Sequence, residues 1–220
     1  MSVEQQMDLQ SQISKNTSPS VFIIESLDFD DENGPREGKL ISDILEMSGI
    51  NNKYVYVRTK AELIHFIDQY IKSQFRFLHI SCHGDENHLA TTLDKISHVE
   101  LGEIFSGRLK YRRLFLSACA SVNESLAESL FKKTGCNSIV GPNKTVYMDE
   151  IAIFWASFYH LMFKTNPSAM KKVDLISTLD TLAKLYLIPI KYYKKSTRHP
   201  YYSEQRLVQG ASKPRLTDFD

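Results

Sequence analysis

The chain has 220 residues, of which 42% are hydrophobic and 24% are charged, and this is enough for one globular domain with a buried core. The formal net charge of +1 lacks the basic excess of nucleic-acid-binding proteins, so neither DNA nor RNA is expected as a direct partner. Three cysteines are too few, and odd in number, for a disulfide framework, and they favour a reducing compartment.

The two segments that bear on localisation are the N-terminus and the most apolar stretch. Residues 1–18 are polar and have no apolar run of the signal-peptide type, so we interpret them as an arm that is either unstructured or a short added helix. The stretch 151–163 is too short to cross a bilayer and contains His160, which predicts a buried helix and no membrane association. Together these features predict a cytoplasmic protein.

The first half of the chain alternates short apolar runs with segments of helical spacing. Continuous apolar runs are typical of strands that are covered on both faces. Apolar residues three or four positions apart are typical of helices. A capping box at Thr59 and Glu62 marks the start of the second helix. We expect strands at 21–24, 54–57 and 75–80, and helices at 39–47 and 59–73.

The second half continues this alternation after one interruption. Residues 89–99 contain two β-prone pieces, which predict a small hairpin. A second capping box, Ser121 with Glu124, is expected to open the helix after the fourth strand, and Pro167 suits the first turn of the last helix. We expect strands at 113–116 and 138–140, and helices at 100–106, 121–135, 146–164 and 167–186.

Alternation of this kind indicates a mostly parallel sheet with helices on both faces. In such sheets, ligands bind beyond the carboxyl ends of the strands. The third strand is followed there by Cys82 and His83, and the fourth by Cys119. If the two strands are neighbours, the thiol of Cys119 and the imidazole of His83 emerge at one edge and form a nucleophile with its acid–base partner.

Local features favour Cys119 as the nucleophile. The helix expected directly after it would place a partial positive charge near the sulfur and favour the thiolate. Backbone N–H groups at that helix start, with the N–H of Gly84, are candidates for an oxyanion hole. Gly84 also has no side chain to obstruct a substrate carbonyl.

Other interpretations of these residues stay open at this point. A cysteine at a strand end is more often a small buried hydrophobe than a nucleophile, and we interpret Cys82 and Cys136 in that way. His79 is expected to be buried and to face away from His83. A metal site is a weaker alternative, because the potential ligands lack paired spacing, and no metal is expected. Those potential ligands are His79, Cys82, His83 and His88.

Two segments carry a resemblance to a known family. The run His-Ile-Ser-Cys-His83-Gly84, followed by Leu-Phe-Leu-Ser-Ala-Cys119-Ala-Ser, resembles the CHAT group of caspase-like peptidases, which includes separase-like enzymes. This group pairs a His-Gly at the end of one strand with a Ser-Ala-Cys at the end of the next. Further similar stretches lie at 140–142, 147–152, 158–161 and 199–210. The chain departs from the family at Ser203, where an aromatic residue is frequent, and in its short loops.

The resemblance implies a fold and a mechanism. The fold is a caspase-like three-layer α/β/α sandwich with a mostly parallel central sheet of about six strands, spanning 19–212 and followed by a tail at 213–220. The mechanism is peptide hydrolysis through a thioester, in which Cys119 attacks the carbonyl and His83 protonates the leaving amine. The N–H groups of Gly84 and Cys119 stabilise the oxyanion, and no metal or organic cofactor is required.

Carboxylates are expected near the substrate groove. Glu25 and Asp28, with the rest of an acidic run at 28–32, follow the first strand, and Asp149 follows the fifth. Such groups would attract a Lys or Arg side chain, so we expect cleavage after a basic residue, with Asp149 as the pocket floor. The alternatives are a solvated acidic loop at 28–32 and a helix cap at Asp149.

The sequence therefore predicts a cysteine endopeptidase that acts on a protein or peptide substrate. The alternative is a catalytically inactive scaffold or protein-interaction module with the same fold. By the habit of small CHAT-like proteins, we expect a role in bacterial defence or regulated cell death, with an activating or sensor protein as a partner.

Overall fold

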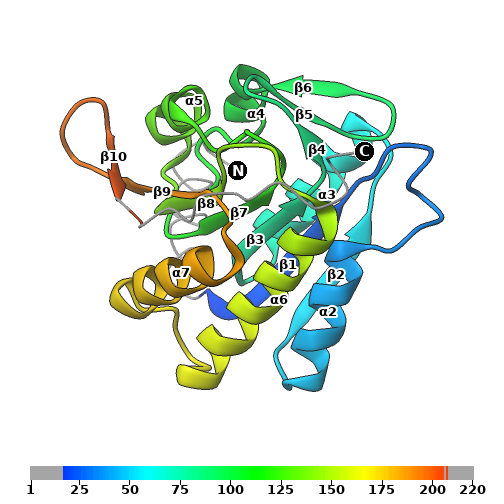
Figure 1. Ribbon diagram of the computed structural model, residues 1–220. Coiled ribbons are helices and arrows are strands. Elements are labelled where there is room, and N and C mark those ends of the chain that lie inside the picture. Colours follow the sequence, from blue (N-terminus) through cyan, green and yellow to red (C-terminus); the bar gives the residue numbers. More distant parts are fainter. Residues whose placement is uncertain (1–16, 206, 208–220) are drawn as a thin grey trace, which may run out of the picture.

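A seven-stranded sheet forms the centre of the computed structural model, which describes residues 17–205 and 207 (Figure 1). The spatial order of its strands is β10-β9-β8-β7-β3-β1-β2. In chain order they are β1 (Ser18–Glu25), β2 (Asn52–Tyr56), β3 (Phe75–Ser81), β7 (Arg113–Ser117), β8 (Ser138–Pro142), β9 (Ile190–Lys195) and β10 (Tyr202–Gln205). From β2 to β8 neighbouring strands are parallel, whereas β9 and β10 pair antiparallel at one edge. The expected mostly parallel sheet is confirmed, with seven strands in place of about six.

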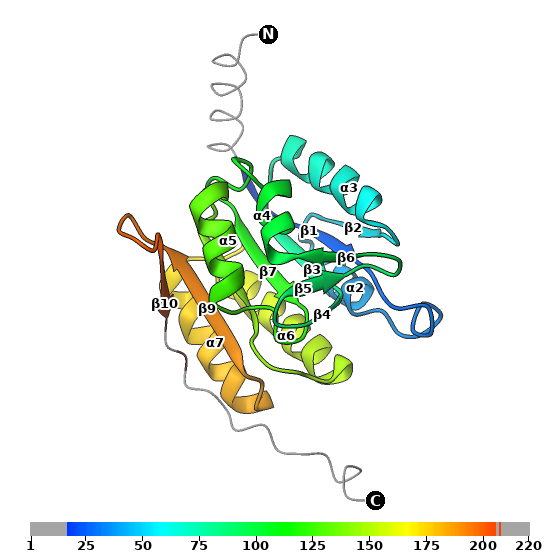
Figure 2. The same ribbon diagram turned by 90° about the horizontal axis from the view of Figure 1, so that it is seen from above.

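Helices cover both faces of this sheet, as Figures 1 and 2 show. One face packs against α2 (Glu37–Met47), α6 (Met148–Thr165) and α7 (Lys172–Tyr186). The other face packs against α3 (Lys60–Lys72), α4 (His98–Ile104) and α5 (Glu124–Thr134). Successive residues of β1 alternate between the two cores: Phe22 and Ile24 face α3, and Val21 and Ile23 face α2. Burial on both sides explains the continuous apolar runs of the central strands.

A second, three-stranded antiparallel sheet follows directly after β3. It consists of β4 (His83–Gly84), β5 (His88–Ala90) and β6 (Lys95–Ser97). Leu89 and Ile96 anchor it in the core shared with α3 and α4. The hairpin expected at 89–99 is thus confirmed, and it has a third strand that begins at His83.

One expected helix start is wrong. Ser121 does not cap α5; Asn123 does, because its side-chain oxygen accepts a hydrogen bond from the N–H of Leu126. Ser121 instead donates towards the backbone oxygens of Asp85 and Cys119. Asn is at least as good an N-cap as Ser, and it stands next to the first helical residue. The capping box expected at Thr59 and Glu62 is confirmed.

The C-terminal part differs most from expectation. The last helix begins at Lys172 rather than Pro167, because the Asn166 side chain accepts hydrogen bonds from the N–H groups of Ser168 and Ala169 and holds a turn there. Strand β9 was not expected at all. The closing strand expected within 199–210 is β10, at 202–205, and residues 208–210 lie outside the described residues.

Strand β1 begins at Ser18, so the boundary expected between an arm at 1–18 and a domain from 19 falls at the start of this strand. Residues 1–16 of the arm and the tail at 213–220 lie outside the described residues. Within 17–205, no helix combines the length and the apolar character that crossing a membrane requires.

Candidate active site

The two strands that carry the expected dyad are direct neighbours. Strands β3 and β7 pair in parallel, with Ser81 opposite Ser117 at their carboxyl ends. The chain continues from these two serines to His83 and to Cys119. Both functional side chains therefore leave the sheet at one edge, as the alternation of strands and helices predicted.

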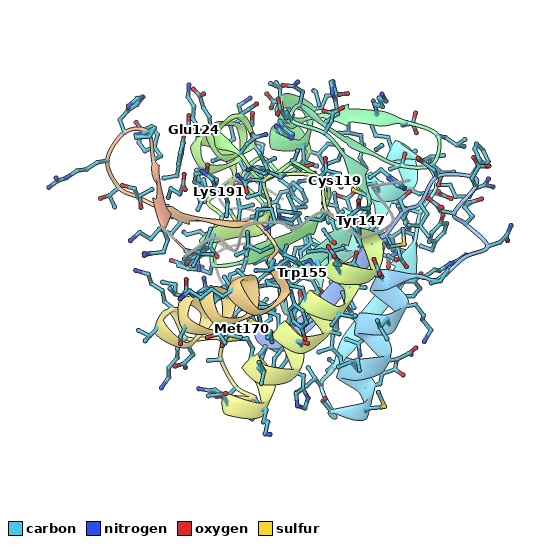
Figure 3. All side chains as sticks on the ribbon, in the orientation of Figure 1. Cys119, Glu124, Tyr147, Trp155, Met170 and Lys191 are labelled. Carbon is cyan, nitrogen blue, oxygen red and sulfur yellow. The ribbon has the colours of Figure 1, made fainter. Side chains whose placement is uncertain are left out.

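Cys119 and His83 line one cavity of about 220 Å³. Each residue is only half-buried, so the cavity is reached from the surface. Figure 3 shows Cys119 beside Tyr147, which precedes α6 and lines the same cavity. The remaining lining residues are Leu27, Glu37, Ser81, Cys82, Ser117, Ala118, Val146, Met148 and Ile151. The thiol and the imidazole expected to form the pair thus belong to residues that line the same cavity.

The loop after β7 holds Cys119 in a tight turn. Its Sγ lies 3.5 Å from the backbone oxygen of Val146 and donates to it. The next residue, Ala120, has a φ of 54°, a left-handed conformation that is unusual for a residue with a Cβ and recurs at functional sites. Helix α5 begins at Glu124 rather than at Ser121, so the helix start expected directly after Cys119 lies further along the chain.

The same loop narrows the choice of oxyanion donors. The N–H groups of Ala120, Ser121 and Val122 already donate to backbone carbonyls. The N–H groups of Gly84 and Cys119 are therefore the remaining candidates among those expected from the sequence.

Gly84 is required for close packing between the segment that carries His83 and the loop that carries Cys119. A Cβ at this position would lie 2.4 Å from Ser121 Oγ and 3.0 Å from Ala118 Cβ. Strand β4, which carries His83, therefore rests directly on the loop that carries Cys119. The residue type was expected for substrate access, and the structure adds this packing requirement.

His83 lies next to the acidic loop that follows β1. Its Nε2 is 3.3 Å from an Asp31 carboxylate oxygen and 3.7 Å from one of Asp28, without an aligned hydrogen bond to either. The histidine side chain is 40% exposed and the two carboxylates are about half exposed. Asp28, expected to bind substrate, thus lies beside His83, the histidine expected to be catalytic.

The other two expected substrate-binding carboxylates do not line the cavity of Cys119. Glu25 is fully buried and accepts hydrogen bonds from the Gly38 N–H and the Tyr54 hydroxyl, both at 2.7 Å. Burial raises its pKa above the usual carboxyl value. Asp149, in the first turn of α6, lines a neighbouring cavity of about 700 Å³ next to Arg36, which shares Glu37 and Met148 with the cavity of Cys119. Glu25 and Asp149 are therefore both absent from the lining of the cavity of Cys119, and Asp149 lies in the cavity beside it.

The carboxylate that lines the cavity of Cys119 is Glu37, the first residue of α2, which sequence reasoning missed. Its side chain is 4% exposed. The Oε2 atom accepts hydrogen bonds from Ser81 Oγ at 3.0 Å and from Ser117 Oγ at 2.7 Å. The Oε1 atom has no hydrogen-bond partner and lies 3.4 Å from His79 Nε2. The sequence held only an indirect indication of this carboxylate. Each of the two strands that lead to the expected dyad carries a serine two positions before the expected catalytic residue.

His79 and Cys136 match their structural interpretation. His79 is buried and faces α6, where its Nδ1 lies 3.2 Å from the Tyr159 hydroxyl oxygen. Cys136 is buried, and burial raises the pKa of its thiol to about 12. Cys82 packs against the core but is only half-buried and lines the cavity of Cys119, so it matches the interpretation in part. Among the described residues, no three His, Cys, Asp or Glu side chains are grouped so as to hold a metal ion.

The fold is a caspase-like α/β fold, and two solved structures of cysteine peptidases are similar to it. Caspase-1 from Spodoptera frugiperda matches with a TM-score of 0.50 and 13% identity, covering 87% of this chain and 85% of that one. The Arg-specific cysteine proteinase gingipain R matches with a TM-score of 0.49 and 14% identity, covering 84% of this chain. The chain spans 50% of the length of the gingipain R structure. No protein-family model and no curated protein matches the sequence.

Proposed function

We propose that this protein is a cysteine endopeptidase in which Cys119 is the nucleophile and His83 the general acid and base. The observation that carries the proposal is that the two side chains leave adjacent parallel strands and line one cavity. A nucleophile beside its acid–base partner in a surface cavity is the arrangement that acyl transfer needs. The caspase-like fold supports this, and the paired His-Gly and Ser-Ala-Cys segments support the finer assignment to the CHAT group.

The proposed reaction needs only groups present at this edge of the sheet. Cys119 Sγ forms a bond to the scissile carbonyl carbon while its proton passes to His83, and the N–H groups of Gly84 and Cys119 stabilise the oxyanion. When the C–N bond breaks, His83 returns the proton to the leaving amine. Water then attacks the thioester with His83 as base, and the C–S bond breaks to release the acid and restore the thiol.

The preference proposed is for a basic residue before the cleaved bond. Glu37 is the only ionisable carboxylate among the residues that line the cavity of Cys119, and neither Lys nor Arg lines it. A carboxylate among the lining residues, with no cationic side chain beside it in that lining, favours a cationic substrate side chain. Glu37 thereby takes the role that the sequence had suggested for Asp149.

The test is a panel of fluorogenic peptides that differ only in Arg, Lys, Asp or Leu before the cleaved bond. Cys119→Ala and His83→Ala should each remove cleavage, with Cys136→Ala as a matched control because Cys136 is buried and does not line the cavity. Full cleavage by Cys119→Ala would disprove the nucleophile, and preference for Asp would disprove the basic pocket. A folded wild type that cleaves nothing, alone or with a partner encoded beside it, would favour the scaffold alternative.

We also propose a compartment and a biological role for this protein. Three free cysteines suit a reducing compartment, and we therefore place the enzyme in the cytoplasm. By analogy with small CHAT-like proteins, we propose a role in bacterial defence or cell death with an activating protein. Co-purification of a partner that raises the cleavage rate would support this role.

A further inference from the structure

A second cavity adjoins the candidate active site, namely the neighbouring cavity of about 700 Å³ that Asp149 lines. It lies between α2 and α6, which run side by side in Figure 1. Glu37 at the start of α2 and Met148 at the start of α6 line both this cavity and the cavity of Cys119. The two cavities are therefore at most one side chain apart.

The neighbouring cavity can be entered from the surface. Pro35, Lys39 and Leu40 line it and are exposed, and the apolar Leu40 keeps 41% of its surface accessible. Its volume lies within the range of about 300 to 1,000 Å³ that is usual for ligand pockets, whereas the cavity of Cys119, at about 220 Å³, is smaller. A substrate that extends beyond the residue bound beside Cys119 therefore has a place to bind there.

The cationic side chains of the neighbouring cavity already have partners. Lys39 forms an ion pair with Asp43, one turn further along α2. Arg36 donates a hydrogen bond to the Glu32 backbone oxygen, and its guanidinium lies 4.3 Å from the centre of the Tyr56 ring. Neither cation therefore needs an anionic ligand.

Apolar side chains on both helices offer the remaining contact surface. Leu40 belongs to α2, and Met148 and Ala152 belong to α6. Met148 and Ala152 are four positions apart in the helix, so they share one of its faces. A large apolar side chain placed between the helices would remove water from all three residues. Burial of apolar surface is thus the main source of binding energy that this cavity can supply.

From this geometry we infer that the neighbouring cavity binds a large apolar side chain of the substrate, such as Leu or Phe, a few residues from the cleaved bond. The inference rests on the proposed function, since it describes a second contact of the same substrate. The substrate is the occupant because the cavity shares two lining residues with the cavity of Cys119. An extended chain advances about 3.3 Å per residue, so about two to four residues suffice to pass from one cavity to the other.

The experiment uses the full chain and a set of internally quenched peptides. All carry the residue that the wild type prefers before the cleaved bond and alanine elsewhere, and a single Leu is moved through four positions on each side. The kcat/KM of a Leu peptide relative to that of the all-alanine peptide should reach about tenfold at one or two positions, as expected for a buried leucine side chain. Ratios near unity at every position would overturn the inference and leave the peptidase intact. Cleavage of no peptide, with or without an activating partner, would overturn both.

A leucine variant tests whether the neighbouring cavity causes this preference. Leu40→Ala removes an apolar wall and keeps a good helix former in α2, and it should lower the ratio to about threefold or less. Leu185→Ala is the matched control, because Leu185 is an exposed leucine on α7 that lines neither cavity, and its ratio should stay at the wild-type value.

The two variants also separate the substrate from other occupants. An unchanged ratio in Leu40→Ala would overturn the assignment, and loss of activation by a partner in that variant would then give the cavity to the partner. An equal fall of the ratio in Leu185→Ala would also overturn the assignment, because it would show a general effect of removing a surface leucine.

Discussion

Two carboxylate regions lie near the candidate dyad, and they differ in burial and in what they face. The loop at 28–32 holds several exposed carboxylates, two of which approach His83. Glu37 is a single buried carboxylate on the floor of the cavity that Cys119 lines. The loop has more charge, but solvent screens it, whereas a cation that reaches Glu37 leaves water behind. Position therefore outweighs the number of charges in assigning a substrate-binding role.

A substitution of Glu37 tests this comparison most directly. Glu37→Gln should lower kcat/KM for basic peptides by about 10²-fold or more, because a buried cation then loses its charged partner. The matched control is Asp30→Asn, which removes one charge from the exposed loop. Steady-state kinetics on both variants make the test. A loss in Asp30→Asn as large as that in Glu37→Gln would show that the loop, and not the cavity floor, attracts the substrate.

A smaller effect is expected at the acidic loop. The Asp28→Asn, Asp31→Asn double variant should lower kcat/KM a few-fold, since the carboxylates that face His83 Nε2 are half exposed and such pairs contribute little. The deficit should shrink as salt is added, because salt screens exposed charges. The measurement is kcat/KM at low and high ionic strength. A loss of several hundredfold that is independent of salt would instead make the pair as important as the dyad itself.

A third carboxylate, Glu25, is buried but does not line the cavity of Cys119, so it tests the effect of burial alone. Burial raises its pKa, so the folded state disfavours the ionised form relative to the unfolded state. That penalty is absent below the ordinary value of 4.5 and grows as pH rises through the folded pKa. Glu25→Gln should therefore gain stability relative to wild type as pH rises, by at most about 1.4 kcal/mol per pH unit. Urea unfolding from pH 4 upwards measures this, and parallel curves would contradict it.

The smallest effect is expected at Asp149. Because this residue lines the neighbouring cavity beside Arg36 and does not line the cavity of Cys119, Asp149→Asn should leave the Lys and Arg values of kcat/KM within about twofold of wild type. The fluorogenic peptides with Lys or Arg before the cleaved bond serve for the measurement. A selective loss for basic peptides would restore Asp149 as the pocket floor and remove that role from Glu37.

The parts of the fold that depend on local pattern were predictable. The apolar runs of β1, β3 and β7 and the Thr59 capping box identified the elements, and the alternation implied that His83 and Cys119 meet. Strand β9 was not predicted because its Lys residues alternate irregularly with two buried Tyr residues, so its sequence lacks a clear hydrophobic period.

Glu37 could not be predicted because its environment depends on contacts between distant segments. In the sequence it is one acidic residue at the start of a helix, where acidic residues are common at the surface. Its burial arises from the loop after β1 folding back over the ends of β3 and β7, which brings the two serines to it. Asp149 had the same sequence signature, but it lines only the neighbouring cavity, whereas Glu37 lines both. Local pattern cannot separate the two.

The tight fit at Gly84 has a consequence for control of the enzyme. Because strand β4 and the turn at Ala118 and Ser121 leave no room for even one methyl group, the two loops form a single preassembled block. An activator would then have little to gain by bringing imidazole and sulfur together. If the proposed peptidase is regulated, we expect control at entry to the cavity that Tyr147 lines, with the packing of the two loops unaltered.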